Sequence, residues 1–345
     1  MTLYRRILLC TLVLTLVVVV FGAYVRLADA GLGCPDWPGC YGQLSPAHAA
    51  DRINEANQAN PHGPVSMPKA WKEMIHRYLA SAVGFGIILI AFLAWRRRET
   101  AHTNPWLATT LVGVVVFQGL LGMWTVTLLL KPAIVTAHLI GGMTTLAMLV
   151  WLHERAQGRR LTVAPGMAWL AQISLALLAI QIVLGGWVST NYAALACTDF
   201  PTCHGSFWPT ADYGNAFHIV RELGMTAEGD LLSHEALTAI HWTHRIGALV
   251  VGVALAVLGL RLRRADTTRY LGSALLVALA LQIGLGIANV LLSLPLLLAA
   301  AHNGGAALLV IIMVCINYRV RPGVATMCME GGNNDERATT QGSRA

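Results

Sequence analysis

Eight separate apolar stretches constrain this chain more than any other feature of its sequence. A helix of about 20 consecutive apolar residues spans the hydrocarbon core of a bilayer. Only 12% of the 345 residues are charged and 56% are hydrophobic, whereas about 25% of the residues in a soluble domain are charged. A soluble globular protein, a disordered chain and a disulfide-dense secreted scaffold are therefore excluded. The sequence predicts an all-α membrane protein with eight transmembrane helices, at residues 7–25, 77–95, 106–130, 133–152, 167–188, 244–262, 270–294 and 295–317.

Positively charged residues mark one end of these predicted helices. Lys and Arg gather in the cytoplasmic loops of membrane proteins, so the net charge of +7 reflects orientation, and no nucleic acid is expected as a partner. Both termini are then cytoplasmic, and the long segments 26–75 and 189–243 lie outside. The arginines that agree with this orientation are Arg5, Arg6, Arg96, Arg97, Arg98, Arg155, Arg159, Arg160, Arg261, Arg263, Arg264, Arg269, Arg319 and Arg321.

The two ends of the chain carry further expectations. Arg5-Arg6, an apolar run and Ala28-Asp29-Ala30 follow one another in the order of a cleaved signal peptide. The run is long for that purpose and has a counterpart in the second half, so we expect it to be retained as a span. No mitochondrial type of leader precedes it, which favours a bacterial plasma membrane. The polar residues 322–345 are expected to form a disordered cytoplasmic tail.

The second half of the chain repeats the first. Gly22–Pro46 aligns with Gly185–Pro209 at an offset of 163 residues without a gap, and a repeat at this many points indicates duplication. Each unit has four predicted spans, so both units insert the same way up, related by a pseudo-twofold axis along the membrane normal. We divide the chain into residues 1–158 and 159–321, each a four-helix bundle that can build a cofactor site in its core. Further matches are His76-Arg77 with His244-Arg245, Gln118 with Gln282, Gly122 with Gly286, and Ala137-His138 with Ala301-His302.

Four histidines stand at equivalent places in the two units. His76 and His138 belong to the first and His244 and His302 to the second, all near the outer end of helices that run inward. An ionisable group within a span is costly and suggests function. Two imidazoles on facing helices at one depth can ligate a heme iron from both sides. Zinc would need Cys or carboxylate partners at that depth, which the sequence does not offer, and hydrogen-bonded packing histidines are the other alternative.

Polar neighbours of these histidines distinguish the two units. Glu73 precedes His76 by three residues, and the equivalent position in the second unit is His241. A carboxyl beside only one pair suggests that the two sites do different jobs, so Glu73 is the candidate catalytic residue. The alternative is an i,i+4 ion pair between Glu73 and Arg77. Arg77 and Arg245 could bind heme propionates through the guanidinium fork or snorkel toward lipid headgroups.

Buried amides and glycines accompany the histidines. Gln118 and Gln282 are expected to form interhelical hydrogen bonds. The stretches around Gly141-Gly142 and Gly304-Gly305 allow close approach of a helix or a porphyrin.

Four of the seven cysteines form two equally spaced pairs in the outer loops. Each pair flanks an Asp-aromatic-Pro turn, on the side of the membrane where disulfides persist. We therefore predict the disulfides Cys34–Cys40 and Cys197–Cys203, with redox-active thiols or a transient role in heme transfer as alternatives. We expect the remaining three cysteines to be unpaired: Cys10, Cys315 and Cys328.

These motifs resemble the heme A synthase family of membrane oxidases over nearly the whole chain. Thr198 departs from the pattern at the position of Pro35 in the first loop, and nothing in the assignment depends on it. The motifs that carry the resemblance are Gly33-Cys34-Pro35-Asp36-Trp37-Pro38, Glu73 with His76-Arg77, Ala137-His138, Cys197-Thr-Asp-Phe-Pro-Thr-Cys203, His244-Arg245 and Ala301-His302.

The resemblance implies two four-helix halves and an oxidoreductase that converts a methyl group of heme O to the formyl group of heme A for terminal oxidases. It implies that His76 and His138 face the substrate heme, while His244 and His302 hold a resident heme b. Glu73 agrees with this assignment, because the half with the extra carboxyl is then the reacting one. Expected partners are the prenyltransferase that makes heme O, terminal oxidase assembly factors, the lipid bilayer and an electron donor that the sequence does not identify.

Two other functions fit the histidine pattern. One is a two-heme electron-transfer cytochrome that oxidises quinol, and the other is a heme carrier without chemistry. Electron-transfer hemes usually sit at both membrane faces, whereas all four histidines are expected near one face. The masses of the bound hemes separate the three functions, because only a heme A synthase is expected to hold O- and A-type hemes beside heme b.

Overall fold

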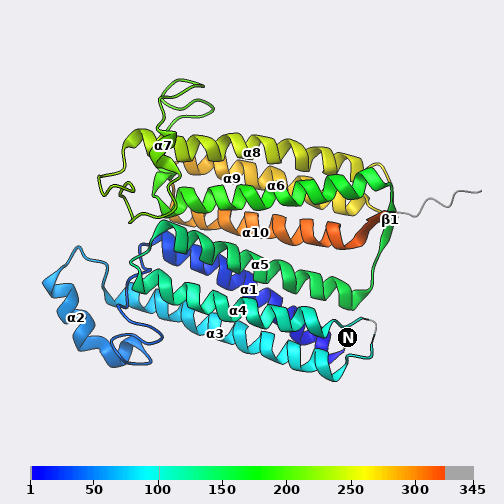
Figure 1. Cartoon of the computed structure of the whole chain (residues 1–345), viewed down its shortest axis with the longest axis horizontal. Coiled ribbons are helices and arrows are strands. Elements are labelled where there is room, and N and C mark those ends of the chain that lie inside the picture. Colours follow the sequence, from blue (N-terminus) through cyan, green and yellow to red (C-terminus); the bar gives the residue numbers. More distant parts are fainter. Residues whose placement is uncertain (1, 101, 323–345) are drawn as a thin grey trace, which may run out of the picture.

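A computed structural model of the chain describes residues 2–100 and 102–322. This described part contains eight helices that are long and apolar enough to cross a membrane, as the sequence predicts. They lie alongside one another in an elongated bundle (Figure 1). In chain order they are α1 (Leu3–Leu27), α3 (Met67–Arg96), α4 (Pro105–Thr127), α5 (Pro132–Gln157), α6 (Pro165–Thr190), α8 (His234–Leu262), α9 (Arg269–Leu291) and α10 (Leu296–Arg319).

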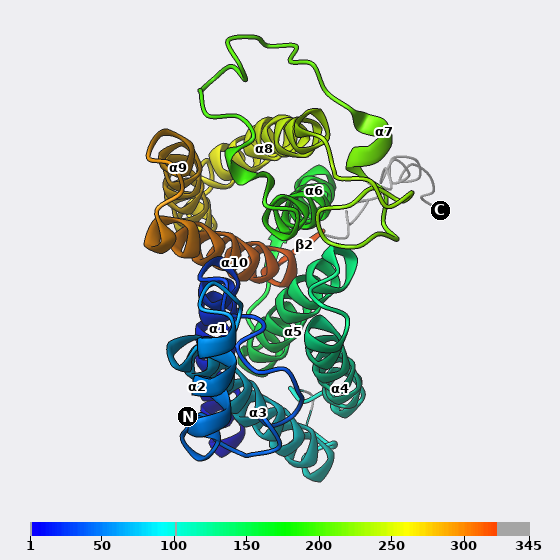
Figure 2. The same cartoon turned by 90° about the vertical axis from the view of Figure 1, so that its left-hand side faces the viewer.

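The eight helices form two groups of four. In the first group α1 and α4 each pack on α3 and α5, which places α3 and α5 at opposite corners (Figure 2). In the second group α6 and α9 each pack on α8 and α10, so α8 and α10 are the opposite corners. The groups meet where α10 packs on α1 and α5, and where α5 packs on α6. Side chains at opposite corners can therefore face each other across the middle of a group.

Each predicted span overlaps one of these helices, but two predicted starts are too late. The helices α3 and α8 begin at Met67 and His234, not at residues 77 and 244. Their first turns are polar, which hides them from a search for apolar runs. Ser233 caps α8 by accepting the N–H of Ala236 at 3.1 Å, as N-cap serines commonly do. The longer helices extend the histidine-bearing segments beyond the apolar core, toward the connecting loops.

Unusual backbone conformations recur at equivalent positions of the two halves. Asp29 and Tyr192 have positive φ angles of 48° and 54°, a region that few non-glycine residues adopt. Further recurring pairs have positive φ or a cis peptide bond, so the two halves of the chain repeat the same local geometry. These pairs are Tyr41 with His204, Gly42 with Gly205, Leu129 with Ser293, Leu130 with Leu294, and the cis bonds before Pro38 and Pro201.

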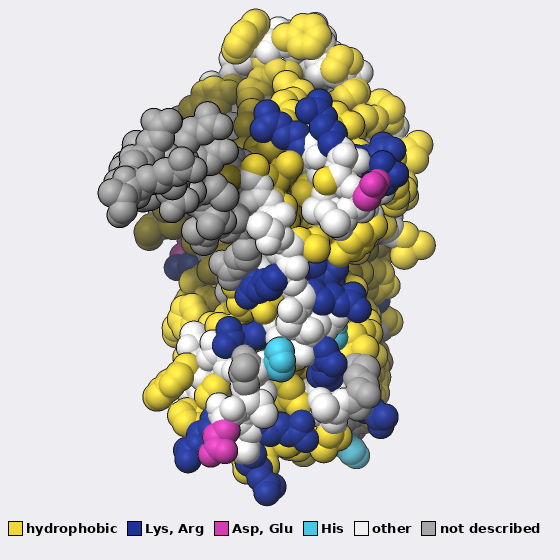
Figure 3. Space-filling model, turned by 90° about the vertical axis from the view of Figure 1, so that its right-hand side faces the viewer, with side chains coloured by type: hydrophobic (Ala, Val, Ile, Leu, Met, Phe, Trp, Pro, Cys, Tyr) yellow, Lys and Arg dark blue, Asp and Glu magenta, His cyan; other side chains and the backbone are white. Residues whose placement is uncertain are grey.

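The two ends of the bundle differ in character. One end carries the long connections, with short helices that the sequence did not predict: η1 (Pro46–Ala49), α2 (Ala50–Ala59), η2 (Ala193–Leu195) and α7 (Tyr213–Ala216). At the other end β1 (Leu161–Val163) pairs in parallel with β2 (Val320–Pro322). Lys and Arg side chains gather on the surface of that end (Figure 3). The predicted tail begins at Pro322, which the structure places at the end of β2. The rest of the tail, residues 323–345 with Cys328, lies outside the described residues.

A buried ion pair joins the two groups of helices near the arginine-rich end. Glu154 of α5 accepts hydrogen bonds of 2.6 and 2.7 Å from Nε and Nη2 of Arg319 in α10. The carboxylate of Glu154 is buried, and Arg319 also donates to the hydroxyl of Tyr270 at 2.8 Å. A two-bond contact of this kind fixes the geometry of both side chains. It therefore holds α5 and α10 in register.

Candidate functional site

The four predicted histidines form two facing pairs. His76 of α3 and His138 of α5 occupy opposite corners of the first group, as His244 of α8 and His302 of α10 do in the second. All four lie toward the end of the bundle that carries the long connections. Facing imidazoles at one depth are an arrangement that can bind a heme iron from both sides.

Each histidine ring rests against a glycine of a neighbouring helix. A Cβ added to Gly22 of α1 would lie 2.8 Å from Cε1 of His76. A side chain at Gly22 would displace the ring, and a side chain at the other three glycines would require the ring to shift by a few tenths of an ångström, so these glycines let the imidazoles pack closely against the neighbouring helix. We call them the seat glycines, and the corresponding distances are 3.2 Å for Gly122 and His138, 3.0 Å for Gly185 and His244, and 3.1 Å for Gly286 and His302.

The histidine pairs fit a heme better than a bare metal ion. Nδ1 of His76, His138 and His302 is buried and has no hydrogen-bond partner within the described residues. Buried polar atoms are nearly always satisfied, so such a cluster is expected where a bound group completes the site. Over the same residues no group of three or more His, Cys, Asp or Glu side chains could hold a metal ion.

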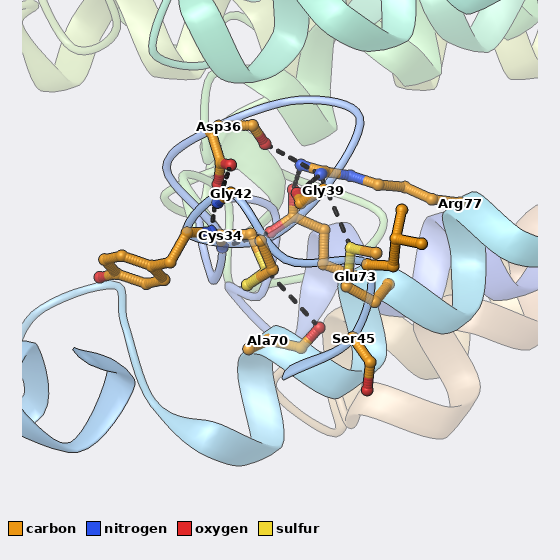
Figure 4. The surroundings of a disulfide bond; sticks show 12 residues. Cys34, Asp36, Gly39, Gly42, Ser45, Ala70, Glu73 and Arg77 are labelled. Carbon is orange, nitrogen blue, oxygen red and sulfur yellow. Dashed lines mark hydrogen bonds and ion pairs between the residues drawn. A yellow bond between two sulfur atoms is a disulfide. The ribbon is translucent and has the colours of Figure 1, made fainter. Parts of the chain in front are cut away.

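The first disulfide loop is fastened to α3 beside His76. The predicted bond between Cys34 and Cys40 is present, and the N–H of Cys34 donates to Oε2 of Glu73 at 2.9 Å (Figure 4). Oε1 of Glu73 accepts from Nη2 of Arg77 at 2.5 Å. The Glu73 carboxylate is only 5% exposed, so it is a buried, charge-paired group that holds the loop. The i,i+4 ion pair considered from the sequence is therefore present.

Arg77 gives this loop its shape. Asp36 in the loop accepts the N–H groups of Tyr41 and Gly42 at 2.6 and 2.7 Å through its carboxylate. The Arg77 guanidinium is committed to Glu73 and to the loop, and its expected contact with a heme propionate stays a prediction. Nη1 of Arg77 donates to the carbonyl oxygens of Asp36, Pro38 and Gly39 at 2.9, 3.2 and 2.5 Å.

The second disulfide loop is fastened in the same way with one change. The predicted bond between Cys197 and Cys203 is present, and the N–H of Cys197 donates to Nδ1 of His241 at 3.2 Å. A neutral imidazole thus replaces the Glu73 carboxylate of the first half. Arg245 takes the place of Arg77 and donates to the carbonyl oxygens of Cys197, Asp199 and Thr202 at 2.9, 2.8 and 2.8 Å.

Asp199 organises the tip of the second loop. Its carboxylate accepts the Thr202 hydroxyl at 2.6 Å and the N–H groups of His204 and Gly205 at 2.7 and 2.9 Å. These bonds, that of the Thr202 hydroxyl above all, hold the pKa of Asp199 below its usual range. The charged form of Asp199 is therefore the one that the folded loop requires.

Comparison with known proteins shows the family of the chain. The family model COX15-CtaA, described as cytochrome oxidase assembly protein, matches residues 5–314. The chain belongs to this family. The heme A synthase of Shewanella oneidensis is 42% identical over 312 residues, which cover 89% of this chain and 94% of the relative. The heme A synthases of Caulobacter vibrioides and Nitrosospira multiformis are 28% and 29% identical, over 88% and 90% of this chain and 92% and 91% of the relatives.

In this member of the cytochrome oxidase assembly protein family, the predicted glutamine bonds are present. Gln118 donates from Nε2 to the carbonyl oxygen of His138 at 2.7 Å, and Nε2 of Gln282 lies 3.4 Å from Nε2 of His302. Sequence reasoning missed Gln181, whose Nε2 lies 3.0 Å from Nδ1 of His244. The signal was available: each glutamine stands four residues before a seat glycine, as in Gln118 and Gly122, Gln181 and Gly185, and Gln282 and Gly286.

Proposed function

We propose that this chain is a heme A synthase, an oxidoreductase that converts the methyl group of heme O to the formyl group of heme A. The observation that carries the proposal is the set of four histidines in two facing pairs, each ring on a seat glycine, in a cytochrome oxidase assembly protein. Support also comes from the relative named heme A synthase, which is 42% identical over most of the chain. Hemes are then both substrate and product.

The two halves have different tasks in this proposal. His76 and His138 bind the substrate heme O, and His244 and His302 hold a resident heme b, which supplies one-electron chemistry at its iron. The difference in charge supports the assignment, because Glu73 places a buried carboxylate on the same helix as His76. The second half has the neutral His241 at that position, which suits a heme that stays in place unchanged.

The protein contributes position and charge to the reaction. The seat glycines fix the imidazoles, and the disulfide loop covers α3 beside His76. Glu73 is the candidate catalytic residue, because a buried carboxylate on the same helix as His76 could act as a general acid or base there. An ionised carboxylate has about four lone-pair sites, and the bonds to Cys34 and Arg77 leave some of them free. The contacts with Arg77 and Cys34 direct the Glu73 side chain toward the loop.

We place the protein in the bacterial plasma membrane with both termini in the cytoplasm. The Lys and Arg side chains at the β1 end support this orientation, since positive charge stays inside. Two four-helix units, residues 1–158 and 159–321, are then related by a pseudo-twofold axis along the membrane normal. The hydroxyethylfarnesyl tail of heme O is long and apolar, so we propose that the substrate enters from the lipid. The prenyltransferase that makes heme O and terminal oxidase assembly factors are the proposed protein partners.

The masses of the hemes that purify with the protein test the proposed function. A heme A synthase is expected to yield heme b together with heme O, heme A or a partly oxidised heme. A preparation from cells that make heme O, yet holding heme b alone in both halves, would contradict the proposal and favour an electron-transfer cytochrome. Bound heme O that is never converted, in the presence of an electron donor and acceptor, would favour a heme carrier.

A further inference from the structure

Three of the four histidines share a contact that the fourth lacks. A glutamine lies one helical turn before the seat glycine and reaches the neighbouring helix, where it contacts the histidine residue. A hydrogen bond between transmembrane helices favours one arrangement of the two helices over others. The contacts are Nε2 of Gln118 to the carbonyl oxygen of His138 at 2.7 Å, Nε2 of Gln181 to the carbonyl oxygen of His244 at 2.9 Å, and Nε2 of Gln282 to Nε2 of His302 at 3.4 Å.

A glycine three residues after each of these histidines makes room for the glutamine. A Cβ added to Gly247 would lie 2.3 Å from Oε1 of Gln181. Any side chain at that position would displace the amide, so the glutamine requires the glycine. We call this combination the glutamine–glycine lock. The other two locks have corresponding distances of 2.0 Å for Gly141 and Gln118, and 2.1 Å for Gly305 and Gln282.

His76 has neither member of the lock. The residue one turn before its seat glycine Gly22 is Val18, and the residue three after His76 is Leu79. A position without the glutamine does not require the glycine, and at His76 both positions differ. Val18 is partly buried against the hydrophobic core, so the contact between α1 and α3 beside His76 is apolar.

The histidine without a lock is His76, which the proposed function makes a ligand of the substrate heme. A substrate heme must bind and leave in every cycle, whereas a resident heme must stay. We propose that His76 is the exchangeable ligand of the substrate heme, because Val18 and Leu79 replace the glutamine–glycine lock that holds the other three histidines. His138 keeps one side of the substrate heme fixed, and both ligands of the resident heme are locked. Val18 and Leu79 are thus positioning residues, and this inference rests on the proposed function.

Exchanging the lock between the halves tests the inference. Val18→Gln with Leu79→Gly installs the lock at His76, and Gln181→Val with Gly247→Leu removes it at His244. Purified full-length protein is mixed with excess apomyoglobin as a heme acceptor, and captured hemes are identified by mass over time. Heme O and heme A report the first half, and heme b reports the second. We expect Val18→Gln/Leu79→Gly to release O- and A-type heme more slowly than the wild type. We expect Gln181→Val/Gly247→Leu to release heme b faster. Each rate should change by about three- to fifteen-fold, the range set by interhelical hydrogen bonds.

A matched variant separates the amide from the change in packing. Val18→Leu with Leu79→Gly introduces the same glycine without an amide, and it should not slow heme release. Unchanged release of O- and A-type heme from a folded Val18→Gln/Leu79→Gly protein would overturn the inference. If that protein does not fold, unchanged release of heme b from Gln181→Val/Gly247→Leu would overturn it equally. In either case heme A can still be produced, so failure of the inference is distinct from failure of the proposed function.

Discussion

The two disulfide loops are built on one plan but are fastened by different chemistry. In each loop, the arginine that follows His76 or His244 donates to loop carbonyl oxygens. The N–H of the first cysteine of the loop donates to a side chain of α3 or α8. That side chain is the carboxylate of Glu73 in the first half and the imidazole of His241 in the second. The carboxylate also pairs with Arg77. Since His241 holds its loop without a charge, loop fastening alone does not require a carboxylate.

The comparison teaches that charge, not shape, separates the two loop attachments. A buried ion pair is weak evidence for stability, because desolvation offsets much of the attraction between the charges. In the second half a neutral group, His241, holds the loop to the helix in the same way. The carboxylate of Glu73 is therefore the feature to connect with chemistry, and the lock missing at His76 is the feature to connect with heme exchange. Both differences lie on α3 and its contact with α1.

The largest expected effect comes from replacing Glu73. Glu73→Gln keeps the size of the side chain and an acceptor for the Cys34 N–H, and Glu73→His copies the second half. We expect both variants to lose heme A production by about 10²–10⁴-fold, the usual contribution of a general acid or base. Both should keep heme b. Heme A production is measured from heme extracts at equal protein amounts. Wild-type production of heme A by Glu73→His would show that Glu73 only holds the loop.

A smaller effect is expected at the contact that joins the halves. Arg319→Met leaves the Glu154 carboxylate buried without its partner, which typically costs about 3–5 kcal/mol. The matched control is Arg269→Met, which removes an exposed pair with Asp266 worth about 1 kcal/mol or less. Thermal unfolding in detergent should show a clear drop in Tm for the first variant only. Equal Tm values would mean that the two halves do not depend on this contact.

The disulfides should stabilise both loops to a similar degree. Each closes a loop with a sequence separation of 6, and so short a loop is worth about 2 kcal/mol in the chain-entropy account. Replacing Cys34 and Cys40 by Ser should therefore lower stability about as much as replacing Cys197 and Cys203. Only the first replacement should also reduce heme A production, because that loop covers the reacting half. Thiol labelling of the wild type before reduction, at all four positions, would show that the bonds do not form in the membrane.

The smallest expected effect concerns pH and the tip of the second loop. The pKa of Asp199 is lowered in the folded protein, so its contribution to stability is present above the unfolded pKa of about 3.9 and is lost as pH falls through the folded value. Hydrogen exchange of the backbone at His204 and Gly205 should therefore show no added loosening between pH 8 and pH 5. Asp199→Asn should loosen both amides throughout that range. A wild-type loop that loosens between pH 7 and pH 5 would contradict this account.

The sequence predicted the spans, the histidine pairs and the disulfides because each leaves a local signal. Apolar runs mark the eight helices, and duplication made single residues such as His138 stand out through their partners. The starts of α3 and α8 were missed because their first turns are polar, although they remain helical. The short helices of the long connections were missed because they leave no periodic signal in the sequence.

The contacts between helices were less predictable. The seat glycines and Gln181 depend on which helix faces which, and the spacing of residues along one helix does not contain that information. Gly141 and Gly305 were expected to admit a helix or a porphyrin, and they receive glutamine side chains. The bonds of Arg77 to the loop carbonyl oxygens were likewise invisible, because they join residues that are far apart in the chain.

The division of labour between the halves is the central claim, and the heme content of four single variants tests it most directly. His76→Ala, His138→Ala, His244→Ala and His302→Ala are purified, and their hemes are extracted and identified by mass and by the reduced absorbance spectrum. We predict that the first two keep heme b and lose O- and A-type hemes, whereas the last two lose most b-type absorbance. Full retention of the b-type spectrum in both His244→Ala and His302→Ala, or its loss in His76→Ala, would contradict the account.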